Sequence, residues 1–336
     1  QRPIAFDESL DADDLAAIFY TGGTTGPAKG VMLSHRNLVL NALQMIVGAG
    51  YDEQDVFLHA APMFHLADAS SIYALTWRGA RQVILPKFDP DAALALVARE
   101  RVTCTIFVPA MIAALLDRPG LASADCRSLR LILHGGAPIA ADLLRRAVGA
   151  FGCSFTQAYG LTEASSHVAL LPREEALLDD PRGRSTGRAT LGVDVRTRRP
   201  DGAVCNPGEI GEVTVRGATI TRGYWRQPAA TASALRDGWF WTGDLGYLDD
   251  EGYIYLVDRA KDVIISGGEN VYPREVEARL ESHPSVSAAA VIGVPDPTWG
   301  ERVHAVVALR PGSGASPTAL QTHCKDRLAG YKCPRS

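Results

Sequence analysis

A loop rich in glycine, threonine and lysine is the first candidate for chemistry in this chain. It forms the run YTGGTTGPAKG from Tyr20 to Gly30. Glycines let the main chain approach an anion closely, while backbone N–H groups, hydroxyls and an ammonium donate hydrogen bonds to it. We therefore expect a phosphate-binding loop and not a merely solvated turn, with donors at Thr21, Gly22, Gly23, Thr24, Thr25, Gly26 and Lys29.

This loop differs from a Walker A motif. In that motif Gly-Lys is followed by Ser or Thr and a helix. Here Lys29 precedes Gly30 and the strand-like run Val-Met-Leu. A GxSxG pattern at residues 183–187 also lacks its required context, because Asp-Asp-Pro-Arg before it is not a strand. A serine-hydrolase elbow is therefore excluded there.

Two further polar segments follow expected strands. Gly135, Gly136 and Ala137 would let a flat base lie against the backbone, although such turns are common. In the segment QAYGLTE, Tyr159 offers a ring, Thr162 a hydroxyl for a phosphate and Glu163 a carboxylate oxygen for Mg²⁺. Taken alone, Glu163 would be read as a first-turn acid stabilised by the helix dipole.

A carboxylate and an arginine are expected to meet near a ribose. Asp244 follows Trp-Thr-Gly at an expected strand end, and Arg259 lies fifteen residues later, beyond another strand. One carboxylate can accept hydrogen bonds from both ribose hydroxyls, and a neighbouring arginine can donate to them. Without that partner, an Asp after a Gly would be read as a turn residue.

In order and spacing, these motifs resemble the adenylate-forming superfamily of acyl-CoA synthetases, aryl-CoA ligases, luciferases and peptide-synthetase adenylation domains. The resemblance runs from about Leu15 onward, with Pro27 one place early and Ala28 in the usual proline position. It implies catalytic roles for Lys29, Thr162 and Glu163, and Mg²⁺ binding by Glu163. It implies that ATP or AMP contacts Thr21, Gly22, Gly23, Thr24, Thr25, Gly26, Lys29, Gly135, Gly136, Ala137, Gln157, Ala158, Tyr159, Gly160, Thr162, Asp244 and Arg259.

The same resemblance implies an acyl pocket and a mobile lid. The acyl pocket would be lined by His65, Gly135 and Gly160, although a lone histidine could instead be a core or capping residue. Lys261 would be the hinge, and Gly267 and Gly268 would close on the pantetheine arm of CoA. We also expect the family's long N-terminal portion and its C-terminal lysine to lie outside this sequence, since Lys332 does not match that lysine.

The implied activity is that of an AMP-forming acyl-CoA synthetase using ATP, Mg²⁺ and CoA. The neutral, apolar stretches 64–70 and 165–171 favour a fatty or aryl acid. Two alternatives stay open: a nucleotide-binding remnant without turnover, and a fatty acyl-AMP ligase that feeds a carrier protein.

Element patterns predict an α/β large domain with a parallel sheet and a small antiparallel subdomain, followed by a small α+β lid. Strands alternate with helices from Val56 to Ala158, which is typical of parallel sheets. Short strands separated by turns begin at Val193. We place the large domain at 1–258, the hinge at 259–261 and the lid at 262–336. The run 15–20 reads as a buried strand, and Ser34 as the N-cap of the helix after it.

Composition describes an ordinary globular protein. The chain has 336 residues, 46% hydrophobic content and a formal net charge of −4, which suggests no nucleic-acid partner. No apolar run is long enough to span a bilayer. Six cysteines without CxxC spacing indicate reduced thiols and a cytoplasmic protein. The sequence leaves the oligomeric state open.

Overall fold

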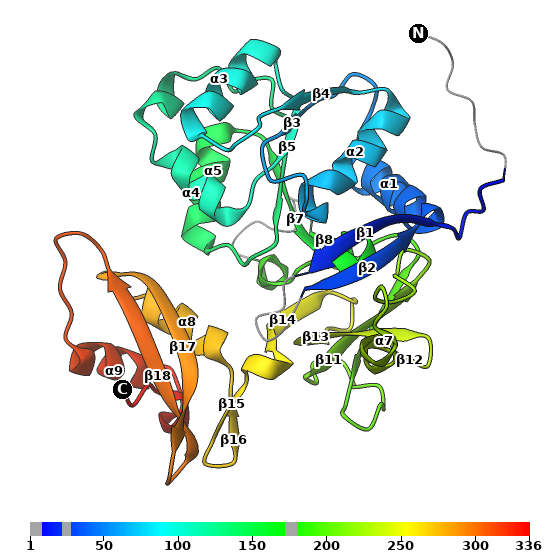
Figure 1. Cartoon of the computed structure of the whole chain (residues 1–336). Coiled ribbons are helices and arrows are strands. Elements are labelled where there is room, and N and C mark those ends of the chain that lie inside the picture. The colour runs from blue at the N-terminus through cyan, green and yellow to red at the C-terminus, as the bar shows by residue number, and fades with distance from the viewer. Residues whose placement is uncertain (1–8, 22–27, 172–179) are drawn as a thin grey trace. The chain divides into compact units, whose positions relative to one another are not determined.

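The computed structural model describes residues 9–21, 28–171 and 180–336 (Figure 1). The chain divides into two compact units: Gln1–Arg196 with Thr214–Trp241 and Asp249–Tyr255, and Thr197–Val213 with Thr242–Leu248 and Leu256–Ser336. The domain boundary expected at residues 259–261 stays a prediction. None of the described helices combines the length and apolarity needed to cross a membrane.

A seven-stranded sheet forms the centre of the first unit. In spatial order, the first five strands are parallel to one another, the sixth is antiparallel to the fifth, and the seventh is antiparallel to the sixth. The predicted parallel sheet is therefore confirmed. In spatial order the strands are β4 (Arg81–Ile84), β3 (Val56–His59), β5 (Cys104–Ile106), β6 (Leu131–Gly135), β7 (Ser154–Tyr159), β8 (Ala169–Leu171) and β9 (Arg188–Ala189).

Helices cover both faces of this sheet (Figure 1). On one face lie α1 (His35–Ala49) and α2 (Leu66–Arg78); on the other lie α3 (Pro90–Glu100), α4 (Pro109–Leu116) and α5 (Ala141–Phe151). Ser34 caps α1 as expected, because its hydroxyl accepts the N–H of Asn37 while the Asn37 side chain accepts the N–H of Ser34. Buried aliphatic and aromatic side chains such as Phe57, Ile132 and Phe155 fill the core.

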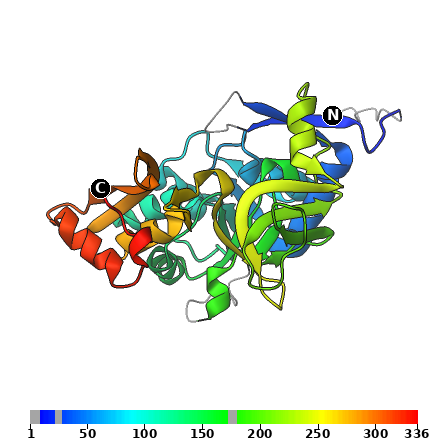
Figure 2. The ribbon, with the colours of Figure 1, turned by 90° about the horizontal axis from the view of Figure 1, so that it is seen from below.

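The phosphate-loop strands form a separate antiparallel hairpin of β1 (Leu15–Thr21) and β2 (Lys29–Ser34). The expectation that residues 15–20 are a buried strand was wrong: they are half-buried, and Tyr20 is 65% exposed. The reason is that β1 pairs only with β2 and never enters the central sheet. An isolated bridge between Val31 and Tyr224 joins this hairpin to the segment before α7 (Pro228–Ala234), which is drawn yellow-green in Figure 2.

A five-stranded sheet follows in the chain. Its order is β10 (Val193–Arg198), β11 (Gly211–Gly217), β13 (Trp239–Leu248) and β12 (Leu235–Arg236), with β14 (Ile254–Arg259) beside β13. Asp244 was expected at a strand end but lies inside β13. Gly243, at a φ of 75°, turns the backbone within the strand without ending it.

The C-terminal part of the second unit is the predicted small α+β fold. Its antiparallel sheet has the order β16 (Glu269–Val271), β15 (Ile264–Ser266), β18 (Gly300–Leu309), β17 (Val286–Asp296). The helices α8 (Pro273–Glu281) and α9 (Pro317–Lys325) supply Val276, Leu280 and Cys324 to its core. All six cysteines of the chain are free thiols in the structure.

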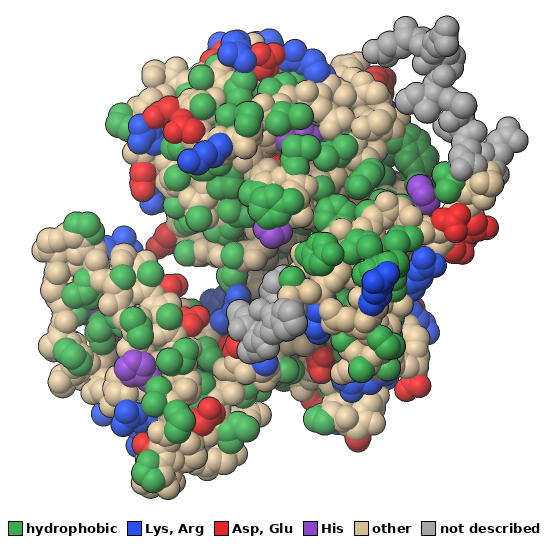
Figure 3. All heavy atoms as spheres, in the orientation of Figure 1, with side chains coloured by type: hydrophobic (Ala, Val, Ile, Leu, Met, Phe, Trp, Pro, Cys, Tyr) green, Lys and Arg blue, Asp and Glu red, His purple; other side chains and the backbone are tan. Residues whose placement is uncertain are grey.

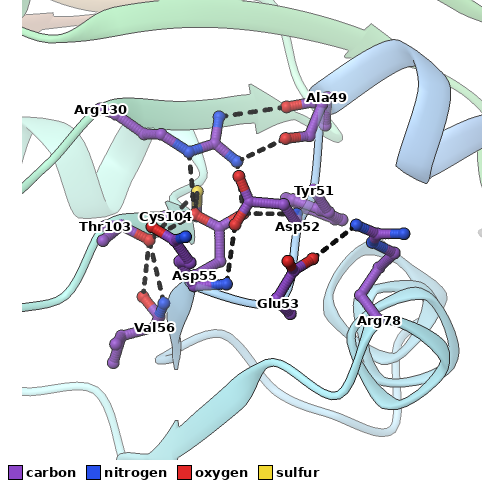
Figure 4. Close-up of polar contacts among 12 residues, drawn as sticks. Ala49, Tyr51, Asp52, Glu53, Asp55, Val56, Arg78, Thr103, Cys104 and Arg130 are labelled. Atoms are coloured by element: carbon purple, nitrogen blue, oxygen red, sulfur yellow. Dashed lines mark hydrogen bonds and ion pairs between the residues drawn. The ribbon is translucent and has the colours of Figure 1, made fainter.

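A polar network joins the amino ends of three central strands (Figure 4). Asp55, before β3, accepts hydrogen bonds from Arg130 Nε at 2.8 Å and from the Thr103 hydroxyl at 2.6 Å. Arg130 also donates to the carbonyl oxygen of Gly50 after α1 at 2.8 Å. Burial would raise the pKa of Asp55, but these hydrogen bonds and that of the Asp52 N–H outweigh it and lower the pKa to about 2.

Charges of both signs are interspersed on the surface. On the face shown in Figure 3, Lys and Arg side chains alternate with Asp and Glu. Surface residues of opposite charge also pair, for example Arg216 with Asp194 at 2.7 Å. Among the described residues on that face, the two signs of charge are mixed and no broad basic area forms.

Candidate functional site

The predicted ligand residues of the first unit gather at one edge of the central sheet. Residues 60–65 follow β3, Gly136 follows β6, and Gly160 to Glu163 follow β7. These three strands are parallel, so their carboxyl ends share an edge. Ligands of open α/β sheets bind at that edge, which makes it the candidate site.

The ends of the predicted phosphate loop are paired across the hairpin. Thr21 ends β1 and lies opposite Lys29, the first residue of β2. The donors expected at Gly22, Gly23, Thr24, Thr25 and Gly26 lie outside the described residues. Of the expected donors, the described part of the loop thus supplies the hydroxyl of Thr21 and the exposed ammonium group of Lys29.

Tyr224, which was not predicted as a site residue, contacts both Glu163 and Lys29 of this hairpin. The Tyr224 hydroxyl donates a hydrogen bond to Glu163 Oε1 at 2.8 Å, and Lys29 Nζ lies 4.9 Å from the centre of the Tyr224 ring. Glu163 is half-buried in the short 3₁₀ helix η2 (Thr162–Ala164), which begins at Thr162. A carboxylate, a lysine and the end of the phosphate loop are therefore neighbours.

The residues around Glu163 fit a magnesium ion that is shared with phosphates. Among the described residues, no hydrogen bond or ion pair reaches the second oxygen, Oε2. No group of three or more His, Cys, Asp or Glu in that part of the chain could hold a metal alone. Mg²⁺ keeps waters and takes only one or two protein carboxylates when it binds nucleotide phosphates, so Glu163 would suffice.

The two predicted base-binding segments are adjacent in the sheet. Gly135 at the end of β6 pairs with Ala158 in β7, and the neighbouring pair joins His134 to Gln157. A Cβ on Gly135 would lie 2.3 Å from the Ala158 carbonyl oxygen, so no larger residue fits there. Gly136 follows with a φ of 75°, and Ala137 is exposed beside it.

Gly160 allows an even closer contact between two backbone segments. A Cβ there would lie 1.5 Å from the carbonyl oxygen of Ser166. The turn that makes this contact contains two non-glycine residues with positive φ, Ser165 at 60° and Ser166 at 122°. Such conformations cost free energy and concentrate at functional sites. Tyr159, expected to stack on a base, is buried beside this turn.

A closed polar network fixes the segment that carries His65. His59, the last residue of β3, contacts Asp68 Oδ1 through Nδ1, and Asp68 Oδ2 accepts the Ala61 N–H at 3.0 Å. His59 Nε2 lies 2.9 Å from the side-chain oxygen of Gln82 in β4. Asp68 and His59 are both buried, whereas His65 is exposed. Sequence patterns alone did not indicate this network.

Two buried histidines flank the same edge. His134 precedes Gly135, and His167 follows the strained turn at Ser165 and Ser166. Burial lowers the pKa of both imidazoles to about 4, so both are neutral at pH 7. Both nitrogens of His134 and Nδ1 of His167 have no hydrogen-bond partner among the described residues.

In the second unit, Asp244 and Arg259 form the expected pair. Arg259 Nε lies 3.1 Å from Asp244 Oδ1. Thr242 orients the acid: its hydroxyl donates to the Val213 carbonyl oxygen at 2.7 Å and accepts the Asp244 N–H at 3.1 Å. The Asp244 side chain is 11% exposed and that of Arg259 is 59% exposed, so the arginine remains accessible to a ligand.

The predicted hinge and CoA residues also lie in this unit. Lys261 is exposed in the 3₁₀ helix η4 (Ala260–Asp262). Asp258, just before it, accepts the N–H groups of Arg259 at 2.8 Å and Arg274 at 3.0 Å, which attaches the hinge segment to the start of α8. This role of Asp258 was missed, because its second partner is sixteen residues away.

Gly267 and Gly268 form a tight turn against an aromatic residue. Both have positive φ, 63° and 85°, and the Gly267 N–H donates to the Trp299 carbonyl oxygen at 2.8 Å. A Cβ on Gly267 would lie 2.8 Å from the Trp299 ring. The Arg335 guanidinium lies 4.1 Å from the centre of that ring. Trp299 is 39% exposed, so an apolar surface with a positive charge adjoins the glycine turn.

Two family models match the chain. The AMP-binding enzyme model matches residues 3–225, and the model of the AMP-binding enzyme C-terminal domain matches residues 275–336. The chain is 44% identical over 331 residues to a feruloyl-CoA synthase of Amycolatopsis, covering 98% of the chain and 67% of the relative. It is 38% identical over 337 residues to a long-chain fatty acid–CoA ligase of Mycobacterium tuberculosis, covering 99% and 66%.

The chain is also similar to solved structures that contain an acyl-adenylate or ATP. The o-succinylbenzoate CoA synthetase of Bacillus subtilis, in complex with its acyl-adenylate intermediate, matches with a TM-score of 0.87 and 37% identity, over 97% of this chain and 65% of that one. ATP-bound MatB from Rhodopseudomonas palustris matches with a TM-score of 0.91 and 38% identity, over 98% and 65%. The chain thus spans about two thirds of the length of these proteins.

Proposed function

This chain belongs to the AMP-binding enzyme family, and we propose that it acts as an AMP-forming acyl-CoA synthetase, an acid–thiol ligase. The observation that carries the proposal is the cluster of Lys29, Glu163 and Thr162 at the carboxyl edge of the central sheet. That cluster can bind and neutralise a polyphosphate, while Asp244 and Arg259 can bind a ribose.

In the proposed reaction, a carboxylate oxygen of the acid attacks the α-phosphorus of ATP. A P–O bond forms, the α–β P–O bond breaks, and pyrophosphate leaves with the electron pair. Lys29, Thr162 and the loop donors stabilise the charge that develops on the phosphate oxygens. Mg²⁺, held by Glu163, would supply further charge neutralisation on the polyphosphate.

In the second half-reaction, the CoA sulfur, as thiolate, attacks the acyl carbonyl carbon. A C–S bond forms, the bond from carbon to the AMP oxygen breaks, and AMP leaves. We propose that Lys261 is the hinge that brings the glycine turn at Gly267 and Gly268 to the acyl-adenylate, and that Trp299 and Arg335 offer a surface for CoA. The protein contributes mainly positioning and electrostatics.

The acid is proposed to be aryl or fatty, bound near His65, Gly135 and Gly160. The 44% identity to a feruloyl-CoA synthase favours the aryl class. His134 and His167 are neutral and add no positive charge to this edge at pH 7, which favours an acid body without a second carboxylate. A cytoplasmic location is proposed from the six free thiols.

The test is ATP–pyrophosphate exchange with ferulate, cinnamate, benzoate and fatty acids of six to eighteen carbons. We expect exchange with at least one aryl or fatty acid, followed by CoA-dependent AMP release. If no acid of the panel supports exchange, the proposal is contradicted and a nucleotide-binding protein without turnover is favoured. Exchange without CoA-dependent release, but with transfer to a carrier protein, would favour a fatty acyl-AMP ligase.

A further inference from the structure

We propose that Tyr224 is a positioning residue of the polyphosphate site, whose hydroxyl orients Glu163 while its ring holds Lys29. The proposal deepens the function proposed above and rests on it. Tyr224 is sixty-one residues from Glu163 in sequence and was not among the expected site residues. Three features of Tyr224 support this role: the hydrogen bonds of the backbone around it, its buried side chain, and its contacts with Glu163 and Lys29.

The backbone around Tyr224 attaches two ligand-binding segments to each other. On one side, the Met32 N–H donates to the Gly223 carbonyl oxygen at 3.0 Å, and the Trp225 N–H donates to that of Gly30 at 2.7 Å. On the other side, the Thr221 N–H donates to the carbonyl oxygen of Glu163 at 2.7 Å. The segment from Thr221 to Trp225 therefore connects the strand after the phosphate loop with the magnesium carboxylate.

The side chain of Tyr224 repeats this connection. It is 6% exposed, and its hydroxyl donates to Glu163 Oε1 at 2.8 Å. A phenol is protonated at pH 7, so the hydroxyl is the donor of this hydrogen bond and the carboxylate is its acceptor. With Oε1 bonded to this hydroxyl, Oε2 is the oxygen without a hydrogen-bond or ion-pair partner among the described residues, and we infer that it faces the cation.

The face of the Tyr224 ring holds Lys29 in the same region. The ammonium lies 4.9 Å from the ring centre, within the range in which an aromatic face attracts a cation. Lys29 is exposed, and a free lysine side chain samples many rotamers that it must give up on binding a phosphate. A ring that already restricts those rotamers reduces this entropic cost.

Two substitutions separate the hydroxyl from the ring. Tyr224→Phe removes the hydrogen bond to Glu163 and keeps the aromatic face, whereas Tyr224→Leu removes both. Tyr51→Phe is the matched control, because it removes another buried hydroxyl, which lies 3.3 Å from the Ser71 hydroxyl. Binding of ATP is measured by calorimetry with Mg²⁺ and with EDTA, and thermal unfolding is measured for each variant.

We expect Tyr224→Phe to weaken MgATP binding about three- to tenfold and metal-free ATP binding less than twofold. We expect Tyr224→Leu to weaken both, and Tyr51→Phe to change neither. Unchanged MgATP binding by Tyr224→Phe would overturn the assignment, as would an equal loss with and without metal. If the unsubstituted protein binds no MgATP, the proposed function fails as well, so the two failures are distinguishable.

Discussion

Arg259 Nε lies 3.1 Å from Asp244 Oδ1, joining the last residue of β14 to the interior of β13. The Asp244 side chain is almost buried, and the Asp244 N–H donates a hydrogen bond to the Thr242 hydroxyl. Most of the Arg259 side chain is exposed to solvent. This asymmetry suits a site in which the acid is fixed before the ligand arrives. The arginine can then adjust to the sugar.

We expect Asp244→Ala to raise the Kd of ATP and AMP about tenfold or more, because two hydrogen bonds from ribose hydroxyls to a charged acceptor would be lost. Calorimetric titration with each nucleotide measures this. Asp194→Ala is the control, since Asp194 also pairs with an arginine but on the surface. Equal nucleotide affinities in the Asp244 variant and the unsubstituted protein would refute the ribose assignment.

Replacing Glu163 with Gln tests the metal assignment. Glutamine keeps an oxygen that can accept the Tyr224 hydroxyl but loses the negative charge. We expect the rate of ATP–pyrophosphate exchange to fall on the order of 10²-fold, with the midpoint of thermal unfolding nearly unchanged. Glu53→Gln, in a surface pair with Arg78, should leave the exchange rate as it is. An active Glu163 variant with an ordinary Mg²⁺ requirement would argue against the assignment.

The network of His59 and Asp68 predicts a link between stability and acid binding. We expect Asp68→Asn to lower the free energy of unfolding by about 2 kcal/mol, because a buried charged acceptor is replaced by an amide. We also expect a higher KM for the acid and an unchanged KM for ATP, since Ala61 precedes the segment that carries His65. Steady-state kinetics and chemical denaturation measure both. The surface variant Asp91→Asn serves as control, and a rise confined to the KM for ATP would contradict the link.

The pair of Asp55 and Arg130 predicts a pH-dependent stability. The pKa of Asp55 is lowered to about 2 in the folded protein, from an ordinary value of 3.8. Because the folded state favours the carboxylate, the stabilisation is complete above about pH 4 and is lost as the pH falls through about 2. It is worth roughly 2 kcal/mol at neutral pH.

We therefore expect Asp55→Asn to lower the free energy of unfolding at pH 7 and pH 5 by about the same amount. Between pH 4 and pH 2 the difference from the unsubstituted protein should shrink. Urea denaturation of both proteins across this range measures it. A difference that stays constant down to pH 2 would show that the carboxylate charge is not what stabilises this edge of the sheet.

Local signals predicted most of the fold. The starts of the helices Pro90–Glu100 and Pro273–Glu281 can be predicted from local sequence, because each begins with a proline at its first position. The parallel sheet followed from the alternation of strands and helices. The prediction that Asp244 lies at a strand end was wrong. Thr-Gly-Asp is typical of a turn, and only pairing with neighbouring strands keeps these residues inside β13.

The candidate site was predictable where one short segment supplies several donors, as at Lys29 or Glu163. It was not predictable where the partner is distant in sequence. Tyr224 reaches Glu163, Asp258 reaches Arg274, and His59 reaches Gln82 only after the chain has folded. The expected roles of the loop, ribose and hinge residues stay proposals, and Gly22 to Gly26 lie outside the described residues.

The contact between Gly160 and the Ser166 carbonyl oxygen has a consequence for re-engineering the protein. Even a methyl group at position 160 would overlap that oxygen. In a library randomised at this codon, we therefore expect most variants to misfold. Diversity is better introduced at exposed residues of the segment after β3, such as Phe64 and His65, where new side chains meet solvent. Selection for altered acid preference can then proceed on an intact scaffold.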